Sequence, residues 1–277
     1  ITLLYIRESL WAENVITASK PAATDGRKSC LKNMMGYFKA FSEIGISPNI
    51  KAFEEFDFSK DNYSGQIIVL ANQIAIPVGH VTQLEDFVSK GGKLFIDGLT
   101  GYYDENVHNR LLTRSPYEKL FGGKISEFKH SDEPFYYSFE DGGTIEGRLW
   151  RGLIRPAEKS VPIEKHHDGV VATHSTFGKG EVLWIPGLLG LAAWDNAERL
   201  ATYLSSEFDL MKQFLAFKKH EDGVIMKSLK TREGLISILT NKSEEAREIE
   251  LTGQFINKNS EVLFSDKTGK AEGSTVI

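Results

Sequence analysis

The sequence of 277 residues predicts an α/β layered domain with a mainly parallel sheet, followed by a small antiparallel β domain. In the first part, short apolar strands alternate with segments whose apolar residues recur every three or four positions, as on one face of a helix. After residue 217 the chain contains only short strands separated by turns. We therefore expect a first domain at 1–217 and a second domain at 218–277.

The first strand and the first amphipathic helix follow from the apolar pattern. Residues 2–7 (TLLYIR) form an apolar run typical of a buried strand, and a loop containing Pro21 is expected after it. The helix that follows ends at Gly45, because glycine tolerates the left-handed turn at a helix end. Its predicted inner face consists of Leu31, Met34, Met35, Phe38, Phe41 and Ile44.

Three further strands and a second helix complete the predicted parallel sheet. Strands are expected at 49–56 and 65–72, and the second is apolar enough to be buried on both faces. Pro77 suits the first turn of a helix that the glycine pair at 91–92 ends. The strand KLFID (93–97) comes next. Function in such sheets usually lies at the carboxyl ends of the strands.

The pattern changes in the second half of the first domain. A short helix and a strand are predicted within 115–130, and an irregular stretch rich in aromatic residues is expected at 133–168. A strand at 180–187 precedes a helix in which Asp195 and Glu198 resemble a capping box. The second domain is then predicted from strands at 223–230, 234–241, 247–253 and 261–266.

Composition excludes several classes of function. No apolar run approaches the roughly 20 residues of a membrane helix, so we expect no membrane partner. The net charge is −5 and the basic residues are scattered, which argues against a nucleic-acid partner. A single cysteine permits neither an internal disulfide nor a thiolate metal cluster. The compartment stays open between cytoplasm and periplasm, and we expect no cofactor and no metal.

The stretch KLFIDGLTGYYDEN (93–106) stands at the carboxyl end of a predicted strand, where an active-site turn would lie. Adjacent carboxylates in a surface turn are, however, more often solvated than paired across a substrate. We expect the aspartate that ends the strand to cap the turn or to accept backbone hydrogen bonds. The candidate residues are Asp97, Gly98, Tyr102, Tyr103, Asp104, Glu105 and Asn106.

The aromatic stretch at 133–152 is a second candidate, with Tyr136, Trp150 and Arg151 as its main residues. Aromatic residues with arginine are enriched at protein interfaces, and a local hydrophobic cluster explains the composition equally well. Stacking of sugar rings on Tyr136 or Trp150 is a third interpretation.

Other reactive side chains fit structural roles better. Cys30 lies near the start of the first amphipathic helix instead of at a strand-to-helix elbow, which favours a buried structural cysteine. His166, His167 and His174 follow no known metal-binding spacing, so a metal site is the weaker interpretation.

Several stretches together resemble the middle, trimerisation domain of family 42 β-galactosidases. They are MMGYFKAFSEIGISPNI (34–50), LANQIAIPVGHVTQLEDFVSKGGKLFIDGLTGYYDEN (70–106) and FGKGEVLWIPG (177–187). The final β segment resembles the small C-terminal domain of that family. The resemblance implies a homotrimer and a chain that lacks the catalytic barrel with its two glutamates. Both ends of the chain fall at strand-like residues, which also predicts a fragment, although a trimmed mature protein could look the same. Galactoside would then be a substrate only through the parent protein.

The middle domain of that family is similar in fold to class I glutamine amidotransferases, which implies a flavodoxin-like layered domain. In those enzymes a strand ends in an elbow that carries the catalytic cysteine, and a histidine comes from a later strand. By order of elements the elbow falls near Asp97 and Gly98, where no thiol stands. A carboxylate is a weaker nucleophile toward an amide. The resemblance thus implies an elbow retained without its chemistry, and residues 102–106 become candidates for packing against a neighbour.

Two alternatives to an assembly module stay open. One is an enzyme of the amidotransferase-like or sugar-processing group that uses Asp97, Asp104 or a histidine. The other is a carbohydrate-binding module. No residue is assigned a catalytic role.

Overall fold

The computed structural model describes residues 1–17, 28–110, 115–139, 143–253, 271–272 and 275–276. Its contacts divide the chain into two compact units, one of residues 1–37 and 49–195 and the other of residues 38–48 and 196–277. The expected domain boundary at residue 217 stays a prediction, because contacts alone do not show which segment folds independently. Within the described ranges no helix is long and apolar enough to cross a membrane.

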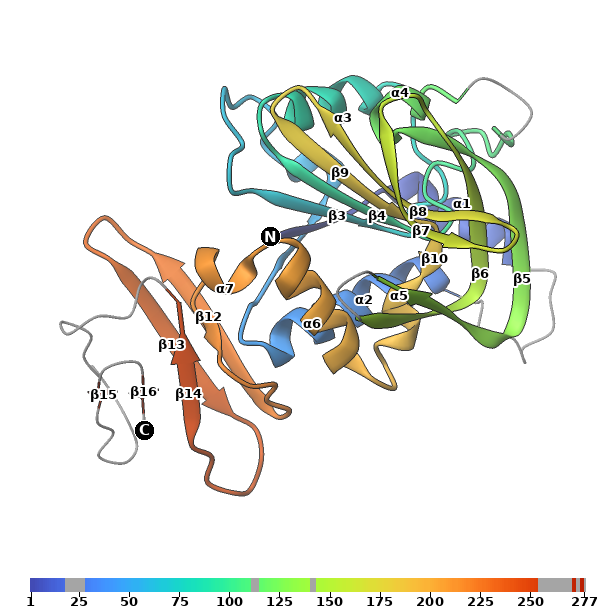
Figure 1. Cartoon of the computed structure of the whole chain (residues 1–277). Coiled ribbons are helices and arrows are strands. Elements are labelled where there is room, and N and C mark those ends of the chain that lie inside the picture. The colour runs from blue at the N-terminus through green and yellow to red at the C-terminus, as the bar shows by residue number, and fades with distance from the viewer. Residues whose placement is uncertain (18–27, 111–114, 140–142, 254–270, 273–274, 277) are drawn as a thin grey trace. The chain divides into compact units, whose positions relative to one another are not determined.

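The first unit is built on a ten-stranded sheet with a parallel core (Figure 1). Five adjacent strands form the core, all parallel to their neighbours. Their order is β2 (Asn49–Ala52), β1 (Thr2–Tyr5), β3 (Ile67–Ala71), β4 (Lys93–Asp97) and β9 (Gly180–Ile185). A short 3₁₀ helix at Phe53–Glu55 follows β2. The predicted parallel sheet is confirmed for this core.

Antiparallel strands extend the sheet beyond β9, and here the expected irregular stretch at 133–168 is wrong. The sheet continues from β9 to β8, β6 and β10, while β5 pairs with β6 and β7 pairs with β8. Bulges between Ser131 and Phe135 in β5 interrupt the alternation by which a strand is read from sequence. The bounds are β5 Gly123–Ser138, β6 Thr144–Pro156, β7 Ser160–His166, β8 Gly169–Phe177 and β10 Gly187–Leu188.

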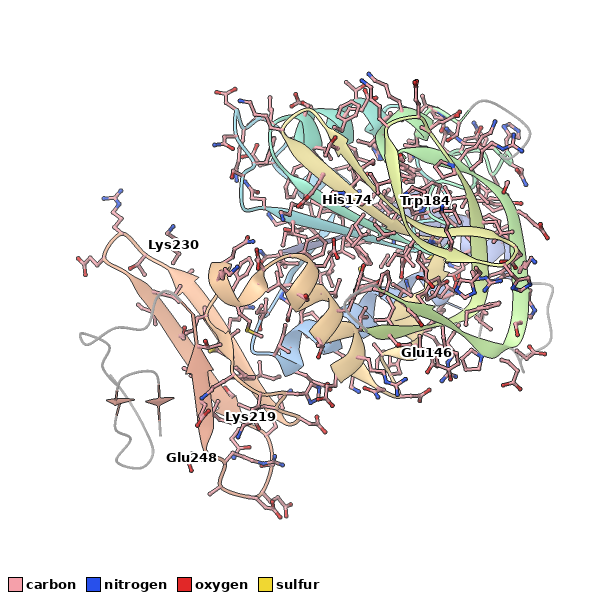
Figure 2. All side chains as sticks on the ribbon, in the orientation of Figure 1. Glu146, His174, Trp184, Lys219, Lys230 and Glu248 are labelled. Carbon is pink, nitrogen blue, oxygen red and sulfur yellow. The ribbon has the colours of Figure 1, made fainter. Side chains whose placement is uncertain are left out.

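Helices cover the two faces of the parallel core (Figure 1). On one face, residues such as Leu70, Ile96 and Trp184 join one apolar cluster with α3 (His80–Ser89) and α4 (Glu118–Phe121). On the other face, the ring of Phe95 contacts that of Tyr37 in α2 (Ser29–Glu43), with 5.6 Å between centroids. Figure 2 shows side chains filling both sides of the sheet, with Trp184 among them. Alternate residues of one strand are thus buried against different helices.

Two expectations about the first helices are corrected. Residues 7–17 form α1 (Arg7–Thr17) instead of the start of a loop, while Pro21 lies outside the described residues. Met34, Phe41 and Ile44 of the predicted inner face of α2 are buried, but Leu31 is 43% exposed. Asn33 and Tyr37, which were not predicted for this face, are buried. These two polar side chains of α2 are buried because they find a hydrogen-bond partner in Asp97 at the end of β4.

Helix α2 meets the short helix α5 (Leu189–Ala192) at a pair of glycines. A Cβ atom on Gly36 would lie 1.8 Å from the carbonyl oxygen of Gly190, and one on Gly190 would lie 1.9 Å from that of Asn33. Only residues without a side chain allow the backbones to approach this closely. This contact brings the side chains of α2 to the end of β4.

The second unit combines helices with small antiparallel sheets. Phe217, Val224, Met226 and Leu251 form its apolar cluster. Its elements are the end of α2, α6 (Ala197–Glu207), α7 (Leu210–Gln213), β11 (Ala216–Phe217), β12 (Val224–Lys230), β13 (Leu235–Asn241), β14 (Ile249–Thr252), β15 (Ala271–Glu272) and β16 (Thr275–Val276). The strand expected at 261–266 lies outside the described residues.

Local signals at the ends of the helices hold with two changes. Pro77, expected in the first turn of a helix, lies before α3, which begins at His80. Gly45 ends α2 in the left-handed region, with Ile46 N–H bonded to the Phe41 carbonyl, as in a Schellman turn. The N-cap expected at Asp195 lies one residue later, and the expected capping box with Glu198 is not formed. The N-cap of α6 is Asn196, whose side chain accepts a hydrogen bond from the Arg199 amide.

The glycine contact yields a direct test of the packing between α2 and α5. We expect Gly36→Ala to lower the free energy of unfolding by about 1 to 3 kcal/mol, because the added methyl must displace backbone atoms. Gly79→Ala is the matched control, since nothing lies within 4 Å of its Cβ position, and it should cost about 0.5 kcal/mol or less. Urea unfolding measures both, and equal values would contradict the close approach.

Candidate functional site at the carboxyl edge of the sheet

The predicted elbow lies at the end of β4, where the chain turns after Asp97. Gly98 has a φ of +61°, in the left-handed region. A Cβ atom there would stand 2.5 Å from Oδ1 of Asn72. Both the conformation and the crowding require glycine at this position. The elbow is therefore a tight turn against the segment that follows β3.

The Asp97 carboxylate is fully buried and accepts hydrogen bonds from three separate segments. From α2, the Asn33 amide donates to both oxygens at 2.8 Å, and the Tyr37 hydroxyl donates at 2.7 Å. The backbone N–H of Asn72, after β3, donates at 2.8 Å. The backbone N–H of Leu189, at the start of α5, donates at 3.2 Å. As the sequence predicts, Asp97 accepts backbone hydrogen bonds.

Burial dominates the protonation of this carboxyl group. It raises the pKa of Asp97 to about 7, against the hydrogen bonds from Asn33, Tyr37, Asn72 and Leu189, which favour the charged form. A nucleophile or a general base must reach a substrate atom. Asp97 has no exposed surface, and both of its oxygens already have donors. The arrangement suits a structural carboxylate that connects three segments better than a reacting group.

The neighbouring crevice between β1 and β3 is also filled. The side chain of Gln73 accepts a hydrogen bond from the Ile6 amide at 2.7 Å and donates one to the Ala71 carbonyl at 2.8 Å. Ser9 of α1 exchanges hydrogen bonds with the backbone of Ala75. Gln73 and Ser9 are fully buried. Protein side chains thus occupy the place where α/β sheets usually hold a ligand.

Cys30 belongs to the same network. Its buried thiol lies 2.9 Å from the Asn72 carbonyl, and its backbone N–H donates to the Glu13 carboxylate. Burial, together with the charge of Glu13, raises the pKa of the thiol well above its usual value. A thiol held protonated in this way is a poor nucleophile. Cys30 is a structural residue at the start of α2.

The loop after the elbow is ordered by its own side chains. Asp104 accepts hydrogen bonds from the amides of Asn106 and His108, both at 2.9 Å. Burial opposes ionisation of Asp104, but these hydrogen bonds outweigh it and lower its pKa. The Glu105 carboxylate accepts from the Val78 amide at 3.3 Å. These two carboxylates therefore stabilise the loop.

The two tyrosines of the loop point to different neighbours. Tyr102 packs its ring against Phe128 of β5, with 5.1 Å between centroids, and its hydroxyl accepts a hydrogen bond from Asn109. Tyr103 packs against a small buried cluster that includes Cys30 and Ile74. Glu105 and Asn106 are the exposed members of the candidate set in this loop.

The structure places the second candidate group on the β5–β6 hairpin. Tyr136 is 49% exposed, whereas the ring of Trp150 packs against that of His130 at 4.9 Å. Arg151 is buried and donates to the Asp168 carboxylate at 2.7 Å. Its guanidinium also lies 5.0 Å from the centroid of the Phe135 ring. The predicted residues are therefore not brought together into one site, and Tyr136 offers the most accessible ring.

Sequence reasoning missed the residues that complete the elbow. Asn33, Tyr37 and Asn72 hold Asp97, although none of them belongs to a recognisable motif. The signal was present in the spacing of α2, because Asn33 and Tyr37 are four residues apart and so lie on one helical face. Among the described residues, no group of three His, Cys, Asp or Glu side chains could hold a metal ion.

Comparison with known proteins identifies the family. Residues 1–208 match the family described as the β-galactosidase trimerisation domain. The chain belongs to the β-galactosidase trimerisation domain family. The resemblance read from the sequence is confirmed. The comparison with curated proteins gives no match.

Solved β-galactosidases contain a domain of the same fold. A GH42 β-galactosidase from G. stearothermophilus superposes with a TM-score of 0.68 and 19% identity over 90% of this chain and 35% of its own. The β-galactosidase from Bacillus circulans sp. alkalophilus gives 0.68 and 17% over 89% and 36%. That from Rahnella sp. R3 gives 0.66 and 15% over 90% and 37%. This trimerisation-domain chain thus spans about a third of the length of these enzymes.

The pH dependence of stability tests the burial of Asp97. Its folded pKa of about 7 lies above the ordinary 3.8, so the folded state holds the proton more tightly between those values. The stabilisation is complete below about pH 4 and is lost as the pH rises through 7, by up to about 4 kcal/mol. We expect the stability of the wild type relative to Asp97→Asn to fall across this window in urea unfolding.

Asp104→Asn is the control with the opposite sign. Because the pKa of Asp104 is lowered, its contribution is present above its ordinary pKa and is lost as the pH falls. A stability difference between wild type and Asp97→Asn that rises with pH would show that the hydrogen bonds, and not burial, control Asp97.

Proposed function

We propose that this chain is the assembly part of a longer β-galactosidase-like glycoside hydrolase. In that protein it holds three copies together and supports a catalytic barrel contributed by another part of the parent protein. Galactoside reaches the active site of the parent protein and does not bind here. The family match over residues 1–208 supports this proposal. The observation that carries it is the buried Asp97. Its hydrogen bonds to three segments close the edge of the sheet at which ligands usually bind.

We also propose that the first unit is a flavodoxin-like domain related to class I glutamine amidotransferases. Its five parallel strands follow the order 2-1-3-4-5 when β9 is counted as the fifth, which is the flavodoxin order. The turn at Asp97 and Gly98 stands after the fourth of these strands. Both observations support an amidotransferase-like scaffold whose elbow carries Asp97 and Gly98 instead of a catalytic cysteine.

The surface for self-association is proposed among the accessible candidate residues. A trimer with threefold symmetry uses two different patches on each copy, because a closed ring needs head-to-tail contacts. Tyr136 on the hairpin and the exposed tip of the loop, Glu105 and Asn106, are two such separate patches. Tyrosine is among the residues that carry most binding energy at interfaces. We propose Tyr102, Tyr103 and Trp150 as less exposed residues near these patches.

Sedimentation velocity of the 277-residue chain tests the assembly role. We expect a trimer, and we expect Tyr136→Ala to weaken its association by about tenfold or more, since loss of an interface tyrosine commonly costs above 1 kcal/mol. Trp11→Ala is the control, because Trp11 is 62% exposed on α1 outside the proposed patches and should leave association unchanged. A strictly monomeric chain, together with a monomeric parent protein, would contradict the proposal.

A further inference from the structure

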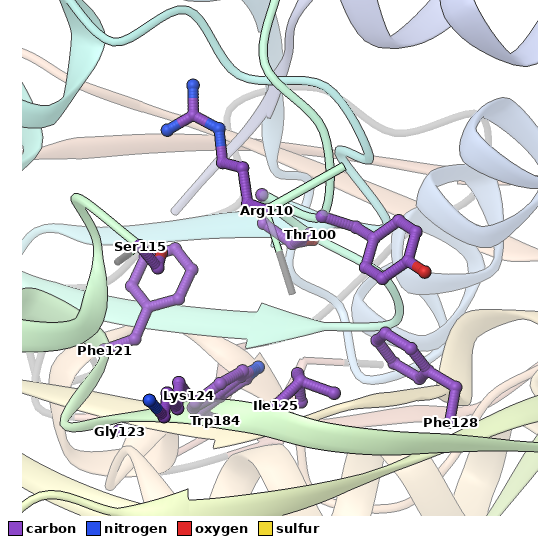
Figure 3. A pocket seen from close by; sticks show the side chains of 11 residues that line it. Thr100, Arg110, Ser115, Phe121, Gly123, Lys124, Ile125, Phe128 and Trp184 are labelled. Carbon is purple, nitrogen blue, oxygen red and sulfur yellow. The ribbon is translucent and has the colours of Figure 1, made fainter. Parts of the chain in front are cut away.

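A small pocket opens beside the closed elbow, between the loop after β4 and the start of β5 (Figure 3). Its walls are mainly apolar and aromatic, from Tyr102, Phe121, Ile125 and Phe128, and Trp184 of β9 also lines it. The space measures about 430 Å³ when the open solvent at its mouth is counted. The enclosed part is much smaller and accommodates a group of only a few atoms. Every residue named here belongs to the first unit.

Trp184 supplies an unsatisfied hydrogen-bond donor to this pocket. The side chain is 3% exposed, and its Nε1–H has no partner among the described residues. The indole packs its ring against Phe121, with 5.5 Å between centroids, so its orientation is fixed. A buried donor without an acceptor costs about 1 to 3 kcal/mol. Among the described residues that line the pocket, Trp184 is the one with a buried polar side-chain atom that has no partner.

The remaining polar groups of the pocket are donors or are already engaged. Lys124 also lines the pocket, and its side chain forms no ion pair or hydrogen bond with the described residues. Arg110 donates to the Ile76 carbonyl and lies against the Tyr117 ring. Thr100 Oγ1 is bonded to three backbone groups. None of the described lining residues carries a carboxylate or an amide side chain.

From this chemistry we propose that the pocket binds a small monocarboxylate with a short apolar body. One carboxylate oxygen accepts the hydrogen bond of Trp184 Nε1, and the charge is neutralised by Lys124 at the mouth. The apolar body packs against the side chains of Phe121, Ile125 and Phe128, which line the pocket. This proposal is independent of the assembly role.

Other occupants fit the pocket less well. A sugar carries several hydroxyl donors, and the described lining offers them no free carboxylate or amide acceptor. An ordered water would satisfy Trp184 but would leave the ammonium of Lys124 and the apolar walls without a role. A carboxylate side chain from a neighbouring copy shares the same chemistry, so the experiment must separate it from a free carboxylate.

The test follows the indole N–H signal of Trp184 by NMR in the 277-residue chain labelled with ¹⁵N-tryptophan. Trp184→Phe removes the donor but keeps an aromatic ring, so the signal that it lacks identifies Trp184. Sodium propionate is titrated at constant ionic strength. We expect a saturable downfield shift of this signal alone, and a response at least tenfold weaker to propionamide, because a charge-assisted hydrogen bond is about twice as strong as a neutral one.

Two lysine variants separate a built site from general attraction of anions. Lys124→Met should weaken propionate binding about tenfold, whereas Lys119→Met, a neighbouring cation outside the pocket, should leave it unchanged. Absence of a shift, or equal responses to propionate and propionamide, overturns the proposal. A Trp184 signal that moves with protein concentration and not with propionate also overturns it, since a neighbouring copy then fills the pocket. None of these results bears on whether the chain forms trimers.

Discussion

A single buried carboxylate organises the carboxyl edge of the sheet. Asp97 draws together α2, the turn after β3 and the start of α5 through hydrogen bonds of 2.7 to 3.2 Å. Burying a carboxyl group is unfavourable unless hydrogen bonds compensate, so each donor must hold its position. The glycine pair at Gly36 and Gly190 exists because α2 must come this close for its side chains to reach Asp97. The other features of this edge follow from that requirement.

The same requirement explains why the edge does not resemble an active site. In doubly wound sheets the crevice beyond the strand ends is the usual place for ligands. Here Gln73 and Ser9 fill the crevice between β1 and β3, and Asp97 fills the elbow after β4. This polar network closes the edge of the sheet to ligands and fixes the segments that form it. A closed edge is consistent with the assembly role that we propose for this chain.

The sequence predicted what local patterns determine. Strand β3 is uniformly apolar and β4 has an apolar centre, and the turn at Gly45 follows from the conformational freedom of glycine, so these features could be predicted from the sequence. Helix α1 was missed because Trp11 and Val15 are exposed, which blurs the apolar period. The partners of Asp97 were missed because Asn33 and Tyr37 interrupt an apolar face, and a rule based on hydrophobicity discounts them. Pairing of Arg151 with Asp168 depends on how β6 lies against the turn between β7 and β8, which local patterns in the sequence do not determine.

In this structure the elbow at Asp97 is a closed, hydrogen-bonded turn. Native-state hydrogen exchange of the Asn72 and Leu189 amides, which both donate to Asp97, measures this most directly. We predict that both amides exchange only through global unfolding, with a free energy equal to that measured by urea unfolding. Exchange through a local opening of low free energy, as in ligand-binding loops, would contradict the account.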